Sequence, residues 1–297
     1  MSGARAIPWW VKRVGFVLKR ADTTEAAAIA RDLVPWLASR GCEAFVEEEH
    51  SALAIGAKEV PDGQLGDHIE LLIAIGGDGT LLHGAGMVAE RGVPILGINL
   101  GRLGFLVPFD SADARDALDR ALQGKLPLDE RMLLRVALHR PGVAPPTVRS
   151  ALNDAVISQS AMARILELHA ALDGQKIAVY KADGLIVSTP TGSTAYNLAA
   201  GGPILTPGQS AMAVTPICPH MLTNRPLVVP STSRVSVEIG GDRDAVLTVD
   251  GQWAQAVAPG DRVEISRAER SLKLYRSEKT YFEILREKLK WGEHALR

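Results

Sequence analysis

The segment GGDGT, residues 76–80, brings together residue types that can bind phosphate and move a proton. It follows the apolar run 71–75, which predicts a short strand buried on both faces. The glycines tolerate positive φ and let phosphate oxygens approach the backbone, because no Cβ intervenes. We expect Thr80 to cap a helix whose free N–H groups attract an anion. The segment therefore predicts a phosphate-binding turn.

Asp78 is the residue that a phosphate-binding turn does not explain. A carboxylate repels phosphate, so Asp78 is accounted for if it holds a proton, a metal ion or a substrate hydroxyl. The alternative is an Asx turn, in which the side chain only organises its own backbone. Short Gly/Asp segments occur in both settings, and this one alone does not separate them.

The composition narrows the class of protein. A chain of 297 residues is long enough for two domains, and its 46% apolar and 23% charged residues are typical of a globular protein. A net charge of −1 gives no electrostatic case for a nucleic-acid or membrane partner. The chain has two cysteines, no secretory signal in its first residues and no apolar run of about 20 residues. These features predict a reduced, cytoplasmic setting.

The first part of the chain alternates strands with helices. Its strand-like runs are residues 11–18, 43–48, 71–75 and 93–98, and its helical runs are residues 23–39, 80–91 and 111–123. This alternation predicts an α/β domain over residues 1–125, built as a doubly wound, Rossmann-like parallel sheet. Ligands of such sheets bind beyond the carboxyl ends of the strands, where the glycine turn and residues 99–104 both fall. A tight connection without ligand contact is the alternative for the second segment, which begins with Asn99.

The second part of the chain has a different character. Short strand-like runs between turn residues predict a β-rich domain of layered sheets over residues 126–270. Asp173-Gly174 and Asp250-Gly251 are candidate hairpin turns. An amphipathic helix over residues 279–291, within a C-terminal segment 271–297, is expected to return to the first domain or to form a subunit contact.

Two segments of the β-rich part carry polar groups that sheet packing does not require. In residues 182–205, an apolar strand leads into TPTGST and a short helix, which we expect Ser193 or Thr194 to cap. Tyr196 can stack on a base there, or simply pack. Asn153 and Asp154 lie together in an otherwise apolar run, where ligand hydroxyls or amides would satisfy them. A turn formed by this Asn-Asp pair is the alternative.

The ordered motifs resemble those of the ATP-NAD kinases. They are GGDGTLLHGAG at 76–86, GINLGRLGF at 97–105, LNDAVIS at 152–158 and DGLIVSTPTGSTAYNLAAGGPIL at 183–205. The resemblance extends over nearly the whole chain. Its GGDG turn is shared with diacylglycerol and sphingosine kinases, and phosphofructokinases have a related one, whereas the longest motif is specific. The resemblance to the ATP-NAD kinases implies transfer of the γ-phosphoryl of ATP to the 2′-hydroxyl of the adenosine ribose of NAD, which produces NADP.

The resemblance also implies roles for individual residues. Asp78 would take the proton from the 2′-hydroxyl, and Asn153 and Asp154 would contact the adenosine half. Lys181 and Asp183 would meet the nicotinamide side or a neighbouring subunit. His83 is placed near the phosphates, with an exposed helix histidine as the alternative. From the motifs and the resemblance together, the residues expected at the nucleotides are Gly76, Gly77, Gly79, Thr80, His83, Asn99, Asn153, Asp154, Arg164, Lys181, Asp183, Thr194, Ala195, Tyr196, Asn197, Leu198, Ala199 and Gln252.

The same resemblance implies a divalent metal ion, with Mg²⁺ expected, and ATP as the phosphoryl donor. No side chain is assigned as a ligand of that metal. It further implies a homodimer or homotetramer. Two other functions stay open on sequence grounds. A lipid or small-polyol kinase can use a similar GGDG turn, and a non-catalytic dinucleotide-binding regulator can use Asp78 only as a turn residue.

Overall fold

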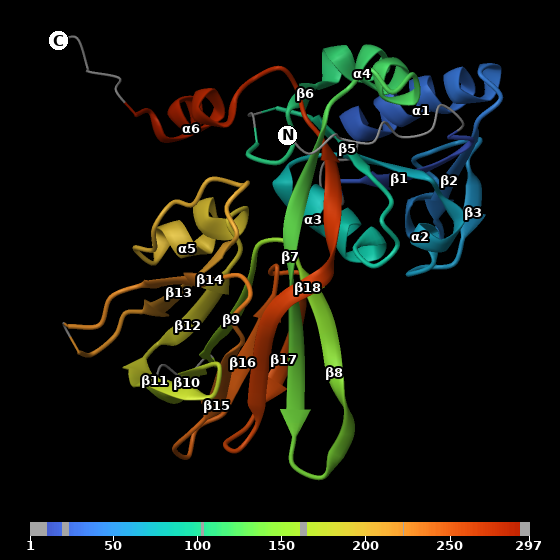
Figure 1. Ribbon diagram of the computed structural model, residues 1–297. Coiled ribbons are helices and arrows are strands. Elements are labelled where there is room, and N and C mark those ends of the chain that lie inside the picture. The colour runs from blue at the N-terminus through green and yellow to red at the C-terminus, as the bar shows by residue number, and fades with distance from the viewer. Residues whose placement is uncertain (1–10, 20–23, 102–103, 161–164, 222, 292–297) are drawn as a thin grey trace. The chain divides into compact units, whose positions relative to one another are not determined.

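The computed structural model describes residues 11–19, 24–101, 104–160, 165–221 and 223–291. Within it the chain divides into two units. The N-terminal unit consists of Met1–Glu130 and Leu272–Arg297, and the C-terminal unit is Arg131–Ser271. Each unit has its own apolar core, so each is described by itself (Figure 1).

A parallel sheet forms the centre of the N-terminal unit. Its strand order is β3-β2-β1-β4-β5, and the short β6 pairs with β5. Strand β4 follows the register expected of a buried parallel strand, with Val14 opposite Leu71 and Ile73 opposite Leu96. The strands are β1 (Arg13–Leu18), β2 (Glu43–Glu47), β3 (Lys58–Val60), β4 (Leu71–Ile75), β5 (Ile95–Asn99) and β6 (Phe109–Asp110).

Helices cover both faces of this sheet, as Figure 1 shows. Helices α1 (Thr24–Ser39) and α4 (Ala114–Leu122) pack on one face in a single apolar cluster with the strands. Helices α2 (Leu65–His68) and α3 (Asp78–Val88) cover the other face. Two short 3₁₀ turns, η1 (Glu48–His50) and η2 (Ser111–Asp113), complete the connections. This is the doubly wound arrangement that the alternating pattern predicts.

The C-terminal end of the chain belongs to the N-terminal unit. The end of β18 (Arg262–Tyr275) pairs with β5, with Leu274 opposite Ile95. Helix α6 (Tyr281–Leu289) follows, and it begins with a capping box between Thr280 and Glu283. Lys288 Nζ of α6 lies 5.8 Å from the centroid of the Phe105 ring.

The C-terminal unit contains two sets of strands. One sheet has the order β14-β13-β12-β9-β16-β17, and all its neighbours are antiparallel. The other set contains β11, β10, β15 and β18, together with the β7–β8 hairpin. The strands not yet bounded are β7 (Leu128–Arg140), β8 (Val143–Ala151), β9 (Asp154–Gln159), β10 (Leu166–Leu172), β11 (Gln175–Ala182), β12 (Gly184–Ser188), β13 (Ala211–Ile217), β14 (Leu227–Pro230), β15 (Val235–Ile239), β16 (Ala245–Val249) and β17 (Trp253–Val257).

One apolar cluster joins the two sets of strands of this unit. Inward side chains such as Leu168, Leu185 and Val237 are fully enclosed, while neighbouring positions along each strand face outward. Two short helical segments, η3 (Gly192–Thr194) and α5 (Tyr196–Ala199), follow β12. The expected fold class, an α/β domain and a β-rich domain of layered sheets, is confirmed.

Several local expectations are wrong at the edges of elements. Pro35 is expected to bend or end the first helix, but α1 continues through it to Ser39, because Pro35 lies on the exposed side, where water can replace the missing hydrogen bond. The sequence does not predict β8, since prolines oppose a central strand, but β8 pairs only with β7 and tolerates them as an edge. It does not predict β17 either, and β18 continues past Ser266 to Tyr275 although charged residues interrupt its apolar alternation.

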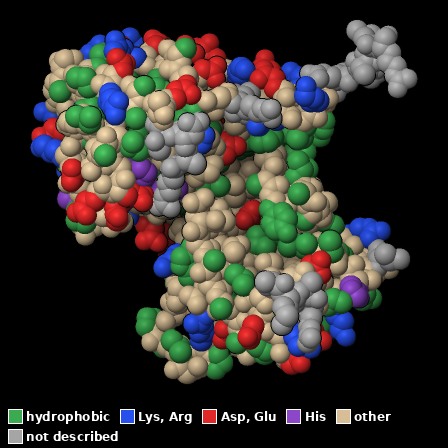
Figure 2. Space-filling view, turned by 180° about the vertical axis from the view of Figure 1, so that it is seen from behind, with side chains coloured by type: hydrophobic (Ala, Val, Ile, Leu, Met, Phe, Trp, Pro, Cys, Tyr) green, Lys and Arg blue, Asp and Glu red, His purple; other side chains and the backbone are tan. Residues whose placement is uncertain are grey.

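The distribution of charged side chains on the surface agrees with the net charge of −1. On the face shown in Figure 2, acidic and basic side chains are interspersed. None of the helices within the described ranges combines the length and the apolar character that crossing a bilayer requires.

Candidate active site

The glycine turn joins β4 to α3 in the N-terminal unit. Gly76 is required by packing, because a Cβ built on it would lie 2.2 Å from Thr80 Oγ1. Around Gly77 and Gly79 a Cβ would meet nothing within 4 Å, and both residues are exposed. None of the three has positive φ, so the turn does not use the left-handed backbone that glycine tolerates. The fold itself does not demand glycine at positions 77 and 79, which leaves clearance for another molecule as the reason.

Helix α3 begins two residues earlier than expected. Its first residue is Asp78, its N-cap is Gly77, and no side chain caps it, so the capping role expected of Thr80 is wrong. Thr80 lies instead within the first turn, with its hydroxyl against Gly76. The N–H groups at the start of α3 are therefore not occupied by a side-chain cap.

Asp78 is held by backbone amides from a segment far along the chain. Phe105 N donates to Asp78 Oδ2 and Leu106 N donates to Oδ1, each over 2.9 Å. A Cβ on Gly104 would lie 2.1 Å from Oδ1, so only glycine admits this approach. The Asx-turn alternative does not describe these bonds, whose partners lie 27 and 28 residues away. The carboxylate is half-buried and fixed in orientation, as a group that must meet a substrate atom has to be.

Asn99 and His83 lie at two other positions of the same unit. Asn99 ends β5 and is buried, and its Nδ2 donates to Gly101 O over 3.0 Å. It thus shapes the backbone that follows β5. His83 lies on α3, with Nε2 3.9 Å from Glu49 Oε1. His83 is partly buried, and the contact described here is with Glu49 and not with Asp78.

In the C-terminal unit, the Asn153-Asp154 pair is organised by Asp250. The carboxylate of Asp250 accepts the backbone N–H groups of Leu152, Asn153 and Asp154, over 2.7, 2.7 and 3.0 Å. All three of these residues are buried, and Asp154 is 5% exposed. The pair begins β9, beside the end of β12, where Asp154 lies opposite Ser188. The turn around Asn153 is therefore formed by Asp250 rather than by its own side chain.

The TPTG segment packs directly on this turn. Thr189 N donates to Asn153 O over 2.8 Å, and Thr189 Oγ1 donates to Leu152 O over 2.6 Å. A Cβ on Gly192 would lie 2.2 Å from Asn153 O, so this position admits only glycine. Three segments that are separate in the sequence, those around Asn153, Thr189 and Asp250, thus meet in one place.

The helix after the TPTG segment is shorter and differently capped than expected. Helix α5 starts at Tyr196 after Ala195, and neither Ser193 nor Thr194 caps it. Ser193 Oγ bonds Pro190 O and Leu205 O instead. Tyr196 is 47% exposed, so its ring is open to a ligand or solvent.

The other residues expected along 194–199 differ in what they can offer. Asn197 is fully buried, and its side chain bonds Ser193 O, Pro203 O and Thr215 Oγ1. These bonds give its amide a structural task, which is to hold the loop around α5. Thr194, Ala195, Leu198 and Ala199 are partly or fully exposed.

The remaining residues expected at the nucleotides lie away from the place where the Asn153, Thr189 and Asp250 segments meet. Lys181 and Asp183 come just before β12, at the opposite end from Thr189, and Lys181 Nζ lies 3.9 Å from Glu167 Oε2. Gln252 is exposed in the hairpin turn after Asp250, and its N–H donates to Val249 O. Arg164 lies outside the described residues.

Two carboxyl groups of this unit, the buried Asp154 and the partly exposed Asp250, interact with each other. Burial raises the pKa of Asp154 to about 7, and the neighbouring Asp250 charge adds to the shift. Burial also raises the pKa of Asp250, but the three backbone N–H groups that it accepts oppose this. The proton of the pair therefore resides on Asp154, while Asp250 stays ionised because three donors stabilise its charge.

This arrangement predicts how stability depends on pH. The folded chain keeps a proton on Asp154 up to about pH 7, whereas the unfolded chain releases it near 3.8. The stabilisation is thus full below the unfolded pKa and is lost as pH rises through the folded one. Between pH 5 and pH 8 we expect the wild type to lose about 2 to 3 kcal/mol of unfolding free energy from this group, and Asp154→Asn to lose none of it.

Urea unfolding at pH 5, 6, 7 and 8 measures this difference. Asp244→Asn is the matched control, because Asp244 is exposed on the turn before β16 and should follow the wild-type curve. A gap between wild type and Asp154→Asn that is the same at pH 5 and pH 8 would contradict the assignment of the proton.

The sequence does not predict the hydrogen bonds by which Asp250 organises the Asn153 segment. The sequence marks Asp250 as the first residue of an Asp-Gly hairpin turn, and it does have the positive φ of such a turn, 52°. Its carboxylate, however, faces the Asn153 segment, 97 residues away in the chain. No local feature of the sequence marks this contact, since an Asp-Gly pair is an ordinary hairpin turn.

Comparison with known proteins follows the same two-part division. A family model described as the ATP-NAD kinase N-terminal domain matches residues 14–126. A second, described as the ATP-NAD kinase C-terminal domain, matches residues 152–277. An NAD kinase of Syntrophotalea carbinolica is 45% identical over 286 residues, which is 95% of this chain and 100% of the relative. An NAD kinase of Geotalea daltonii is 44% identical over 288 residues, again 95% of this chain and 100% of the relative.

Solved structures agree at the level of the fold. The crystal structure of yeast NADH kinase complexed with NADH has a TM-score of 0.88 and 26% identity, over 96% of this chain and 89% of that one. An NAD kinase from Archaeoglobus fulgidus in complex with ATP has a TM-score of 0.72, over 94% of this chain and 100% of that one. At 23% identity this second likeness supports the fold alone.

These findings define the class of protein as a kinase, an enzyme that transfers a phosphoryl group. The chain belongs to the ATP-NAD kinase family. The resemblance found in the sequence is thereby confirmed, and neither the lipid-kinase nor the non-catalytic alternative is favoured.

Proposed function

We propose that this enzyme transfers the γ-phosphoryl of ATP to the 2′-hydroxyl of the adenosine ribose of NAD, with Asp78 as the general base. The observation that carries the proposal is the fixed carboxylate of Asp78 at the start of α3, directly between two exposed glycines. Family membership supports NAD as the acceptor and ATP as the donor.

The chemistry asks Asp78 for two things. It must orient the ribose hydroxyl and accept its proton as the oxygen attacks the γ-phosphorus. Two backbone N–H groups, those of Phe105 and Leu106, fix the direction of the carboxylate, and each carboxylate oxygen keeps a second lone pair for the hydroxyl. Held in this way, Asp78 needs no reorganisation during the reaction.

Phosphate binding follows from the turn itself. The uncapped N–H groups of the first turn of α3 and the clearance at Gly77 and Gly79 suit phosphate oxygens.

The oxygen atoms near the turn indicate how Mg²⁺ would be held. Both oxygens of Asp78 already accept amides, so we infer that phosphate oxygens supply most of the ligands and that the ion arrives with ATP. When bound, Mg²⁺ offsets the negative charge that develops on the transferred group.

The C-terminal unit binds the dinucleotide in this proposal. Asn153 and Asp154 contact its adenosine half, where protonated Asp154 can donate a hydrogen bond and Asn153 can both donate and accept. Tyr196, with the exposed parts of residues 194–199, stacks against the adenine. Asn197 holds the loop from within, and Gln252 and Arg164 make further contacts. Lys181 and Asp183, at the other end of β12, serve the nicotinamide side or a neighbouring subunit.

We further infer a homodimer or homotetramer in the cytoplasm. Lys181 supports a shared contact, because it lies exposed at the end of β11, the edge strand of its sheet. Light scattering of the pure protein tests the assembly, and a monomer with full activity would contradict it.

A coupled assay of NADP formation tests the proposed function. We expect turnover with ATP, Mg²⁺ and NAD together, and none when a lipid alcohol replaces NAD. Running ATP or inorganic polyphosphate against NAD or NADH in all four pairings defines the donor and the acceptor. Binding of NAD without any NADP formation in the presence of ATP and Mg²⁺ would overturn the proposal.

A further inference from the structure

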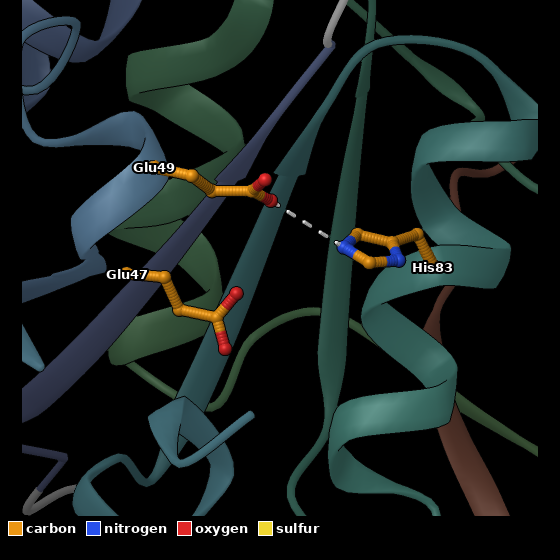
Figure 3. A group of neighbouring side chains, drawn as sticks. All are labelled: Glu47, Glu49 and His83. Atoms are coloured by element: carbon orange, nitrogen blue, oxygen red, sulfur yellow. Dashed lines mark ion pairs between the residues drawn. The ribbon is translucent and has the colours of Figure 1, made fainter. Parts of the chain in front are cut away.

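Three side chains of the N-terminal unit gather where neither the glycine turn nor Asp78 takes part. They are Glu47, Glu49 and His83, whose ligand atoms all lie within 4.8 Å of one another. Figure 3 shows the two carboxylates and the imidazole pointing into one space, with the Nε2 of His83 facing Glu49. They form the one group of this kind among the residues that the structure describes.

The fold explains why these three meet. Glu47 ends β2, and Glu49 follows it in η1. In β2, Val46 belongs to the cluster under α1, so the side chain of Glu47, one residue on, points to the opposite face. Helix α3 covers that opposite face and carries His83. Two different elements therefore present the carboxylates and the imidazole to each other at the carboxyl edge of the sheet.

Glu47 is the observation that singles this cluster out. It is a carboxyl group only 3% exposed, which accepts the N–H of Gly63 over 2.7 Å. The carboxylates of Asp62 and Glu49 lie nearby, and Glu49 N donates to Asp62 Oδ1 over 3.4 Å. A buried carboxylate beside two more carboxylates is costly unless a cation compensates it. The local charge is thus arranged for a cation. Two imidazoles already lie near Glu49, with His50 Nδ1 3.6 Å and His83 Nε2 3.9 Å from its Oε1, so an ion bound beside these carboxylates would also meet a nitrogen ligand.

We propose that Glu47, Glu49 and His83 form a binding site for a divalent transition-metal ion of the Zn²⁺ type. An imidazole ligand disfavours Mg²⁺ and Ca²⁺, which take oxygen ligands, and favours Zn²⁺. Three protein ligands leave one position for water. Tetrahedral Zn²⁺ needs ligand atoms about 3.3 Å apart at its usual bond lengths. The ligand atoms of the three residues already lie within 4.8 Å of one another, so small side-chain rotations of Glu49 and His83 would bring them to this spacing while Gly63 holds Glu47.

This ion is distinct from the Mg²⁺ that accompanies ATP. It would tie the end of β2 to α3, the helix that begins with Asp78. The inference does not rest on the proposed function, because binding is measured without nucleotide and without turnover.

The test titrates metal-free protein with Zn²⁺ in competition with a chromophoric chelator. We expect the wild type to bind one equivalent of Zn²⁺, and Glu49→Gln and His83→Gln each to bind it at least about tenfold more weakly. Co²⁺ is the second probe, and the wild type should give the strong visible absorption of a low-symmetry, four- or five-coordinate ion.

Glu48→Gln is the matched control. Glu48 lies on the same 3₁₀ turn and is exposed, so the substitution removes the same charge without touching the cluster. Its Zn²⁺ affinity should equal that of the wild type, and circular dichroism checks that all variants are folded. Wild-type binding no tighter than that of Glu49→Gln, or an equal loss in Glu48→Gln, would overturn the site.

Discussion

We expect Asp78→Asn to lower kcat by about 10²- to 10⁴-fold, the usual contribution of a positioned general base. The asparagine cannot accept the proton of the ribose hydroxyl, while the glycine turn and the start of α3 stay in place. Since Asp78 is expected to act in the chemical step, KM for NAD and for ATP should change little. Steady-state kinetics of NADP formation, with NAD and ATP varied in turn, measures both parameters.

The structure also says what else this substitution disturbs. The introduced asparagine keeps one oxygen acceptor but turns an amide N–H₂ toward Phe105 or Leu106, so one of the two hydrogen bonds is lost. That loss costs about 1 to 3 kcal/mol, which is less than the roughly 5 to 15 kcal/mol that stabilises a typical folded protein. Asp110→Asn, an exposed aspartate at the end of β6 in the same unit, is the control and should keep full turnover. Equal kcat in Asp78→Asn and wild type would leave Asp78 only its role in holding the Phe105 segment.

Moving the carboxylate without removing it gives an independent check. A Cβ on Gly104 would lie 2.1 Å from Asp78 Oδ1, so Gly104→Ala must displace the carboxylate or its segment. A base misplaced by about 1 Å loses about 10²-fold in rate. Gly86→Ala, on the helix that Asp78 begins, meets nothing within 4 Å and should leave the rate unchanged.

The fold could be predicted because it depends on patterns that are local in sequence. The sequence shows short apolar runs such as 71–75, helical runs between them and a later change to short strands. These patterns can be recognised without knowing any tertiary contact. The wrong predictions concern the strands at the edge of a sheet and the first residues of helices. Strand β8 holds two prolines because it has one neighbour, and α3 starts at Asp78 although no side chain caps it there. Neither fact is a property of the local sequence.

The site was predictable as a set of residue types but not as a set of contacts. Asp78 and the Asn153-Asp154 pair stand out because a carboxylate or an amide is costly inside an apolar run. Their partners do not stand out, because those partners are backbone N–H groups of Phe105 and Leu106, or a hairpin aspartate 97 residues away. Every residue except proline has a backbone N–H, so the sequence contains no mark of which one is used.

Asp250→Ala produces the largest expected loss in the C-terminal unit. It leaves the N–H groups of Leu152, Asn153 and Asp154 without the acceptor that all three share. A buried donor left unpaired costs about 1 to 3 kcal/mol, so we expect the free energy of unfolding to fall by about 3 kcal/mol or more. Urea unfolding followed by circular dichroism measures it.

The same change should weaken dinucleotide binding. Asp250 fixes the turn that presents Asn153 and Asp154, and the Thr189 segment in turn packs on that backbone. We expect KM for NAD to rise by about tenfold, equivalent to about 1.4 kcal/mol of lost binding, because the freed turn must be ordered again on binding. Since Asp78 is untouched, kcat should fall less than in Asp78→Asn.

Asp250→Asn and Asp244→Ala separate this role from a general effect of charge. Asparagine keeps one oxygen acceptor, so Asp250→Asn should lie between the wild type and Asp250→Ala in both stability and KM. Asp244 is exposed just before β16, and its removal should change neither quantity. If Asp250→Ala lowered stability no more than Asp244→Ala does, the three amides would have other acceptors, and the turn would not depend on Asp250. If it lowered stability but left KM for NAD unchanged, Asp250 would support the fold without positioning Asn153 and Asp154 for the substrate.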